Sequence, residues 1–420
     1  MKRNFFIVGL VFLIFFVISL LTNVTGPMLP DIIKSFGLSL ALGGFIPTAF
    51  FLAYGVMSIP AGILIEKFDE KPVLVASFIL AFLGSALFIS KPIYVIFLFS
   101  LFTIGIGMAM LQVAINPLLR VAGGEEHYAF YGVMAQLIFG LASFFSPKLY
   151  SYLVTRLADP GGAHNIVVRL LAKVVPAHIA WSSMYWIFTV VTLLMILLLA
   201  FVKVPRIELK EEEKAGTMAT HLALLKKRIV WLFFLGTFCY VGTEQGVSFW
   251  ISKFLQVYHN VLPTQGGDTA TAWFWGLQTI GCVAGLVLLK LFDSRRILIA
   301  FGALGAVTLA VALAGSRPVA MVAFPLVGFW TSVMWATIFA LALNSVDRHH
   351  GSFSGILCTG IIGGAVMPWI VGKLGDSFGL RSGMLVIFLT LAYIISIGFW
   401  AKPLITNATI GSKKKTAEAA

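Results

Sequence analysis

One carboxylate stands inside a long apolar stretch of this 420-residue sequence. Glu244 follows Tyr240-Val241-Gly242-Thr243 and is the only acidic residue that we place deep within a hydrophobic block. Ionisable groups are costly in such surroundings and are usually retained for function. Glu244 can carry a proton, pair with a cation or accept hydrogen bonds from hydroxyl groups. The alternative is a protonated side chain that bonds a neighbouring helix.

Six amide side chains also interrupt the apolar blocks. Each offers hydrogen-bond donors and acceptors, which suits a neutral polyhydroxylated ligand better than an ion. Each can also simply join two helices. Together with Glu244, they are what a central polar cavity would need. The six are Asn23, Gln112, Asn116, Gln136, Gln278 and Asn344.

Tryptophan supplies a second kind of contact. The flat indole ring can pack against the apolar C–H face of a sugar ring, although tryptophan is also favoured at membrane interfaces. Trp335 is the best candidate for a cavity, because it lies well inside its apolar block.

Composition determines what must position these groups. Hydrophobic residues make up 59% of the chain and charged residues 11%, which excludes an ordinary soluble domain. The runs Leu10–Leu21 and Ile187–Val202 are nearly continuous, whereas a β-barrel would alternate. A bilayer core needs roughly 20 apolar residues per helix. The sequence therefore predicts an all-α integral membrane protein.

We predict twelve transmembrane helices in two pseudo-symmetric bundles of six. The first bundle comprises 5–33, 40–65, 72–90, 92–121, 127–155 and 179–203. The second comprises 228–258, 267–292, 296–315, 317–345, 350–374 and 380–402. Pro117 and Pro368 can interrupt their helices near a cavity.

The charged stretch halfway along the chain divides it. We expect a first bundle over 1–203, a cytoplasmic linker over 204–227, a second bundle over 228–402 and a cytoplasmic tail over 403–420. Loops on the side of the N-terminus carry twice as many basic residues as the loops opposite. The positive-inside rule then predicts an inner-membrane protein with both termini cytoplasmic.

Two short loops on the cytoplasmic side look like partners. Each places acids beside bases in a tight turn, at 66–71 and 292–296. We expect these loops to contribute to gating, although mixed charge in a short loop is ordinary. The gating candidates are Glu66, Asp69, Arg120, Asp293 and Arg296.

Other classes of function find little support. Cys239, Cys282 and Cys358 show neither metal-ligand spacing nor a disulfide framework. The seven histidines lie at the ends of predicted helices or in loops, and no nucleophile–base pair is apparent. We therefore expect no enzyme activity, no cofactor, no metal site and no nucleic-acid partner.

The chain resembles the fucose–galactose–glucose:proton symporter family of the major facilitator superfamily over nearly its whole length. The segments that carry the resemblance are Asn23–Pro30 with Ile59–Leu64, Gly107–Pro117 with Met134–Gln136, Phe238–Gly242, and Thr337–Leu341 with Ile361–Pro368 and Asp376. The resemblance implies the major facilitator fold and sugar transport by alternating access. Asn23, Asn116 and Gln136 match polar cavity or motif positions. Trp335 falls where a tyrosine faces the sugar in members that transport L-fucose, and Glu244 falls where many glucose/galactose relatives carry an acid.

Two positions depart from that pattern. Members that transport L-fucose carry an aspartate in helix one and a glutamate in helix four, where this chain has Gly26 and Gln112. Coupling through Glu244, sodium coupling and uncoupled diffusion all stay open. We expect a monomer in the bilayer that moves a hexose or deoxyhexose, with a proton or sodium ion as possible partner. The alternative is an exporter of cationic or lipophilic small molecules.

Overall fold

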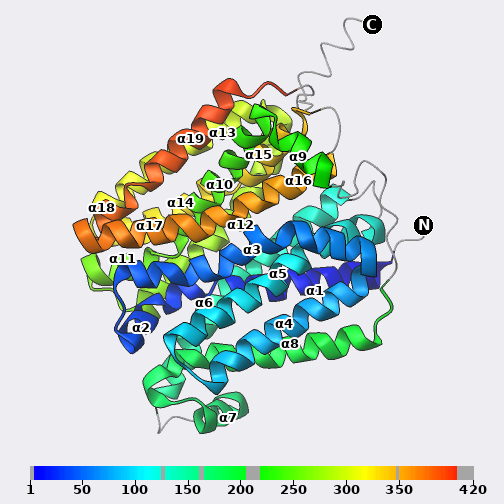
Figure 1. Ribbon diagram of the computed structural model, residues 1–420. Coiled ribbons are helices and arrows are strands. Elements are labelled where there is room, and N and C mark those ends of the chain that lie inside the picture. Colours follow the sequence, from blue (N-terminus) through cyan, green and yellow to red (C-terminus); the bar gives the residue numbers. More distant parts are fainter. Residues whose placement is uncertain (1–3, 124–127, 160–164, 205–217, 347–349, 404–420) are drawn as a thin grey trace, which may run out of the picture.

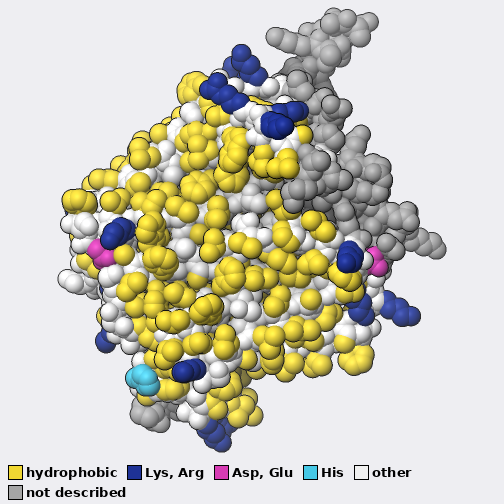
Figure 2. Space-filling view, viewed as in Figure 1, with side chains coloured by type: hydrophobic (Ala, Val, Ile, Leu, Met, Phe, Trp, Pro, Cys, Tyr) yellow, Lys and Arg dark blue, Asp and Glu magenta, His cyan; other side chains and the backbone are white. Residues whose placement is uncertain are grey.

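The computed structural model describes residues 4–123, 128–159, 165–204, 218–346 and 350–403, and the regular elements in these ranges are all helices (Figure 1). Eleven spans among them are long and apolar enough to cross a bilayer. Hydrophobic side chains cover the middle of the face in Figure 2, whereas charged side chains lie mostly toward its margins.

The first group of helices occupies one half of the molecule. It consists of α1 (Phe5–Thr22), α2 (Thr25–Phe36), α3 (Leu40–Phe68), α4 (Glu70–Ser90), α5 (Tyr94–Gly123), α6 (Tyr128–Leu157), α7 (Ile166–Val174), the 3₁₀ helix η2 (Ala177–Ser182) and α8 (Ser183–Phe201). Here α7 is a short helix between the predicted spans 127–155 and 179–203.

The second group occupies the other half. It consists of α9 (Met218–Leu225), α10 (Arg228–Ser248), α11 (Ile251–His259), the π-helical turn η3 (Pro263–Gly267), α12 (Asp268–Leu291), α13 (Ser294–Ala314), α14 (Arg317–Thr331), α15 (Met334–Leu343), α16 (His350–Thr359), the 3₁₀ turn η4 (Gly360–Ile362), α17 (Gly363–Phe378), α18 (Leu380–Met384) and α19 (Ile387–Trp400). We add α10 to these eleven spans, which brings their number within the described ranges to twelve. It has 21 residues, and Thr243, Glu244 and Gln245 make it more polar than the other eleven.

Several predicted spans are pairs of helices rather than continuous rods. The first span of each half is divided, at Asn23–Val24 between α1 and α2 and at Phe249–Trp250 between α10 and α11. Pro117 and Pro368, in contrast, lie inside the continuous helices α5 and α17. Apolar content does not reveal such breaks, because apolar residues continue on both sides of each of them.

The start of α1 and the end of α19 lie on one side of the molecule, which we call the terminal end, and the opposite side is the distal end (Figure 1). The halves meet mainly where α3 packs on α17 and α6 packs on α12. Glycines permit this approach. A Cβ at Gly44 would lie 2.8 Å from the Pro368 carbonyl oxygen, and one at Gly372 would lie 2.4 Å from that of Leu40.

Hydrogen bonds join the halves at the distal end. The Asp376 carboxylate of α17 accepts from the backbone N–H groups of Leu40 and Ala41, both at 2.8 Å. It therefore caps the N-terminus of α3 from the other half, where a negative charge is favoured. The Lys148 ammonium of α6 pairs with Asp268 of α12 at 3.1 Å. Closure at this end thus has both a packing and an electrostatic basis.

The face of α6 that contacts α12 opens toward the terminal end. A Cβ at Gly140 would lie 1.6 Å from the Thr279 hydroxyl of α12. One turn nearer the terminal end, Gln136 is exposed, and a Cβ at Gly132 would meet no atom within 4 Å. The halves are in contact at Gly140 and separate along α6 beyond it.

Gly140→Ala should lower the thermal unfolding midpoint in detergent, because overpacking a close contact costs about 1–3 kcal/mol. Gly132→Ala, on the same face of the same helix, is the matched control. It should be neutral or slightly stabilising, since alanine favours a helix over glycine by about 1 kcal/mol. Equal midpoints for the two variants would show that the α6–α12 contact is not a tight one.

Candidate functional site

The Glu244 carboxylate is bound by neutral donors from two helices. The Tyr240 hydroxyl, one turn earlier on α10, donates to Glu244 Oε1 at 2.5 Å. Gln278 Nε2 of α12 donates to the same carboxylate oxygen and lies 3.2 Å from the Tyr240 hydroxyl. The ring of Trp335, on α15, lies 5.8 Å from that of Tyr240. We call Tyr240, Glu244, Gln278 and Trp335 the Glu244 cluster.

The Glu244 cluster keeps unused hydrogen-bonding capacity. Within the described ranges, Glu244 Oε2 has only a long 3.5 Å contact from Gln245 Nε2. Gln278 Oε1 and, one helical turn earlier, Trp275 Nε1 are buried with no hydrogen-bond partner in the described part of the chain. Buried polar atoms are normally satisfied, so each unsatisfied one needs an explanation. A ligand that brings several hydroxyl groups would provide both donors and acceptors.

A second polar group lies in the first half, at the break between α1 and α2. Asn23 Nδ2 donates to the Ser143 hydroxyl of α6 at 2.8 Å, and Ser143 lies 2.6 Å from the Ser19 hydroxyl. Asn23 is only 6% exposed, and its Oδ1 finds no partner among the described residues. We call Ser19, Asn23 and Ser143 the Asn23 cluster.

The two clusters flank the contact between α6 and α12. Ser143 lies three residues beyond Gly140 on α6, and Gln278 directly precedes Thr279 on α12. Because Gly140 and Thr279 touch, each cluster lies within about one helical turn of the junction between the halves. A ligand at this junction would be able to meet groups from both halves.

Gly26 occupies a position where a side chain would fit tightly. A Cβ there would lie 3.0 Å from the Ser248 carbonyl oxygen and 3.1 Å from the Phe249 Cα. These are backbone atoms at the break between α10 and α11, so they cannot rotate away. A side chain at position 26 would therefore require the backbones of α2 and of the α10–α11 break to move apart by a few tenths of an ångström.

Comparison with known proteins gives the family. Residues 11–361 match the Major Facilitator Superfamily. The chain belongs to the Major Facilitator Superfamily. It is 30% identical over 396 residues to the glucose/galactose transporter of Brucella abortus, with 92% of each chain covered. It is 26% identical over 381 residues to the L-fucose-proton symporter of Escherichia coli, covering 87% of this chain and 86% of that one.

Solved structures agree on the fold. The Escherichia coli fucose:proton symporter superposes with a TM-score of 0.67 at 24% identity, over 94% of this chain and 98% of that one. A bacterial homologue of the human lysosomal transporter Spinster gives 0.74 at 16% identity, over 94% and 96%. The predicted fold class and family are therefore confirmed. This chain is a multi-pass membrane protein of a transporter family and not an enzyme.

In this major facilitator protein, the predicted site residues fall into separate places. Glu244, Gln278 and Trp335 come together, and Asn23 anchors the other cluster. Asn344 directly follows α15, nine residues beyond Trp335 or about 13 Å along a helix, and so lies outside the Glu244 cluster.

The remaining three amides are less defined. Gln112 is half-buried on α5, and Gln136 is exposed on α6 beside the separated surfaces of the halves. Asn116 lies on α5, but its side chain is outside the described part of the structure. These three residues stay predictions.

Sequence reasoning missed Tyr240 and Ser143. Tyr240 lies one helical turn before Glu244, and that spacing was a usable signal. Ser143 gave none, because its partners lie 120 and 124 residues away in the sequence.

The predicted gating loops make local contacts where the structure describes them. Asp293 accepts hydrogen bonds from the backbone and guanidinium of Arg295, between 2.8 and 3.2 Å, and so caps α13. The side-chain bond from Arg295 holds the pKa of Asp293 below its usual value. Arg296 is exposed, and Asp69 adopts a positive φ of 63° between α3 and α4. The side chains of Glu66 and Arg120 lie outside the described part.

The hydrogen bond between Tyr240 and Glu244 should appear as coupling in a double-mutant cycle. Tyr240→Phe, Glu244→Gln and the double variant should show a coupling of about 1–3 kcal/mol in the free energy of unfolding, the usual range for residues in contact. Unfolding in detergent, followed by circular dichroism, measures it. Tyr393→Phe removes a hydroxyl bonded to the distant Leu232 carbonyl, and in combination with Glu244→Gln it should show no coupling. Additive effects for the Tyr240 pair would contradict the assigned contact.

Proposed function

We propose that this major facilitator protein moves a monosaccharide, a hexose or a deoxyhexose, across the inner membrane by alternating access. The observation that carries the proposal is the Glu244 cluster, in which one carboxylate is held by neutral donors beside an indole ring. Relatives named glucose/galactose transporter and L-fucose-proton symporter support the same substrate class.

The chemistry of the Glu244 cluster suits a neutral polyol. Carboxylate oxygens accept strong, charge-assisted hydrogen bonds from hydroxyl groups. The unpartnered Gln278 Oε1 adds an acceptor, and the indole N–H of Trp275 adds a donor. Trp335 supplies an apolar plane for the C–H face of the sugar, together with Phe339 at 5.3 Å from its ring. Asn23 would contribute from the other half.

Glu244 is also the proposed coupling residue. With glycine at position 26 and glutamine at position 112, it is the acid that remains deep in a span. A half-buried carboxylate that binds both the sugar and a proton would couple sugar transport to proton movement. A sodium ion is the alternative coupling ion. The proton option accords with the name of the L-fucose relative.

The asymmetry of the basic residues supports a terminal end that faces the cytoplasm. In that orientation the distal bonds of Asp376 and Lys148 close the outer side. The separated faces of α6 and α12 then open inward. The proposed gating residues would act when the terminal end closes and the distal end opens. They are Glu66, Asp69, Arg120, Asp293 and Arg296.

A second candidate is the export of lipophilic cations. The aromatic rings of Tyr240, Trp335 and Phe339 beside a carboxylate are a setting in which a cation binds well. The amides in both clusters weigh against it, because a lipophilic cation offers them no hydrogen-bonding groups.

Counterflow in proteoliposomes tests the substrate class without any driving gradient. Labelled D-glucose, D-galactose and L-fucose should exchange saturably, with competition by unlabelled sugars and none by tetraphenylphosphonium. Trp335→Ala should raise the concentration for half-maximal exchange about threefold to tenfold, from the loss of about 1 kcal/mol of ring contact. Trp231→Ala, on the exposed terminal end of α10, is the matched control. Exchange blocked by the cation but by no sugar would favour the exporter.

Glu244→Gln should abolish gradient-driven accumulation and leave part of the exchange intact, because glutamine keeps the size of the side chain and removes its charge. Uptake under an imposed proton or sodium gradient measures accumulation. Asp159→Asn makes the same chemical change beyond the distal end of α6 and should accumulate like the wild type. Normal accumulation by Glu244→Gln would exclude coupling through this residue, whereas loss of all exchange would assign it to binding alone.

A further inference from the structure

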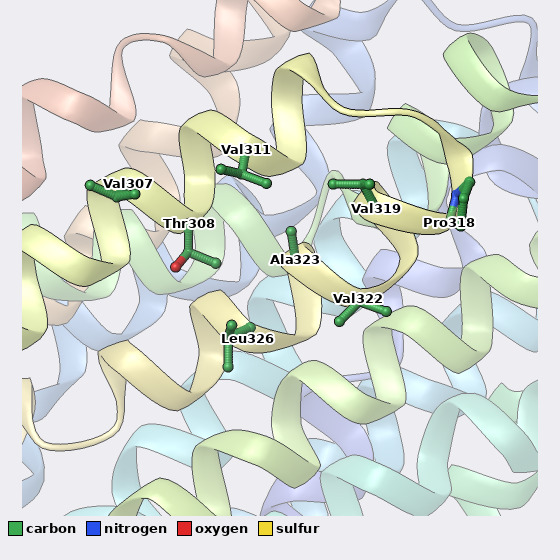
Figure 3. Close-up of a pocket in the computed structure, with 8 residues that line it drawn as sticks. All are labelled: Val307, Thr308, Val311, Pro318, Val319, Val322, Ala323 and Leu326. Carbon is green, nitrogen blue, oxygen red and sulfur yellow. The ribbon is translucent and has the colours of Figure 1, made fainter.

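An apolar groove runs along the outside of the second half, between α13 and α14 (Figure 3). Val307 and Val311 line it from α13, and Val319 and Val322 line it from α14. Its volume is about 510 Å³, within the range of small-ligand sites. Val307 is 61% exposed and Val322 67%. Because both helices are membrane spans, this surface faces the acyl chains of the bilayer.

An unpaired positive charge stands at the distal end of the groove. Arg317 directly precedes Pro318, which lines the groove, and its side chain is exposed at the start of α14. Within the described ranges, Arg317 has neither a carboxylate nor a hydrogen-bond partner. Its charge is therefore available to an anion outside the protein.

Two further basic groups lie at the same corner. Arg317 and Arg381 are both within electrostatic range of His259, the last residue of α11. The Arg381 guanidinium lies 4.7 Å from the centre of the Tyr258 ring, and this contact holds it in place. His259 Nε2 is buried and has no hydrogen-bond partner among the described residues. The corner therefore combines the two guanidinium groups of Arg317 and Arg381 with an adjoining apolar channel.

We propose that this surface binds one anionic phospholipid. An acyl chain lies in the groove between α13 and α14, and the phosphate group lies against Arg317. The lining of α14 extends from Pro318 to Leu326, about 12 Å along the helix from the charged end toward the middle of the span. A charged head at the membrane interface with an apolar tail pointing inward matches this arrangement of charge and apolar surface.

Other occupants fit the surface less well. A water-soluble anion could bind Arg317, but it would not fill the apolar groove lined by valines. A second copy of the chain would need about 800 Å² of complementary surface on each partner, which eight residues in a groove do not supply. The proposal is independent of the transported substrate, because the groove faces away from the Glu244 cluster and rests on different helices.

Native mass spectrometry of the full-length protein tests the proposal. The detergent-solubilised protein is titrated with palmitoyl-oleoyl phosphatidylglycerol and, separately, with the zwitterionic phosphatidylcholine of the same chains. We expect one phosphatidylglycerol to bind more tightly than phosphatidylcholine. Arg317→Gln should weaken phosphatidylglycerol binding about fivefold, the effect of one basic residue on an anionic lipid. Phosphatidylcholine carries the same phosphate, but its choline group cancels the net charge, so its binding should weaken less.

Two variants complete the test. Lys91→Gln removes an exposed charge from the distal end of the other half and should leave the binding of both lipids unchanged. Val322→Trp fills the groove from an exposed position and should weaken both lipids. Gel filtration and the thermal midpoint verify that each variant is folded. An equal loss of phosphatidylglycerol binding in Arg317→Gln and Lys91→Gln would overturn the proposal. So would an unchanged preference in Arg317→Gln, or a concentration-dependent dimer that only Val322→Trp disrupts.

Discussion

A carboxylate inside a membrane span must find hydrogen-bond donors within the protein, because the surrounding hydrocarbon offers none. Glu244 finds them in the Tyr240 hydroxyl on its own helix and in the Gln278 amide on α12. That requirement ties α10 to α12, and the contact between Tyr240 and Trp335 extends it to α15.

The junction between the halves depends on backbone surfaces that approach one another closely. Glycines at positions 44, 140 and 372 stand where a Cβ would come within 2.8 Å of an atom of the other half. These are van der Waals contacts between close-packed surfaces, without hydrogen bonds or ion pairs. Such contacts suit the alternating access that is general to this fold, because they can separate and form again. Asp376 and Lys148 add a small number of directional bonds, and these are placed at one end of the junction. The two ends can therefore differ in how firmly they are held.

Glycine at position 26 has a structural counterpart in the close approach of the two halves. The helix break at Asn23–Val24 brings α2 against the break at Phe249–Trp250, and glycine allows the backbones to meet there. Space that a carboxylate would occupy is used for contact between the halves. In the proposed site the acidic chemistry then rests on Glu244, and coupling to an ion would be accommodated by this carboxylate and its neutral partners.

The sequence by itself determined the membrane class and the approximate limits of the spans, and it singled out Glu244 as an acid inside a span. These features depend on the apolar content of windows about 20 residues long and on the rarity of charge within them, and both are local properties. Gln278 and Trp335 were also recognised, because polar and large aromatic groups stand out in such windows.

The tertiary structure decided which of these residues meet. It brought Gln278 to Glu244, although 34 residues separate them, and it left Asn344 beyond the end of α15. It also showed that Ser143 supports Asn23 and that helices are interrupted at Asn23 and Phe249 rather than at Pro117 or Pro368. Contacts between helices depend on their rotation about their own axes and on the close approach at glycines. Neither can be inferred from the hydrophobic periodicity of a helix that is apolar on all of its faces.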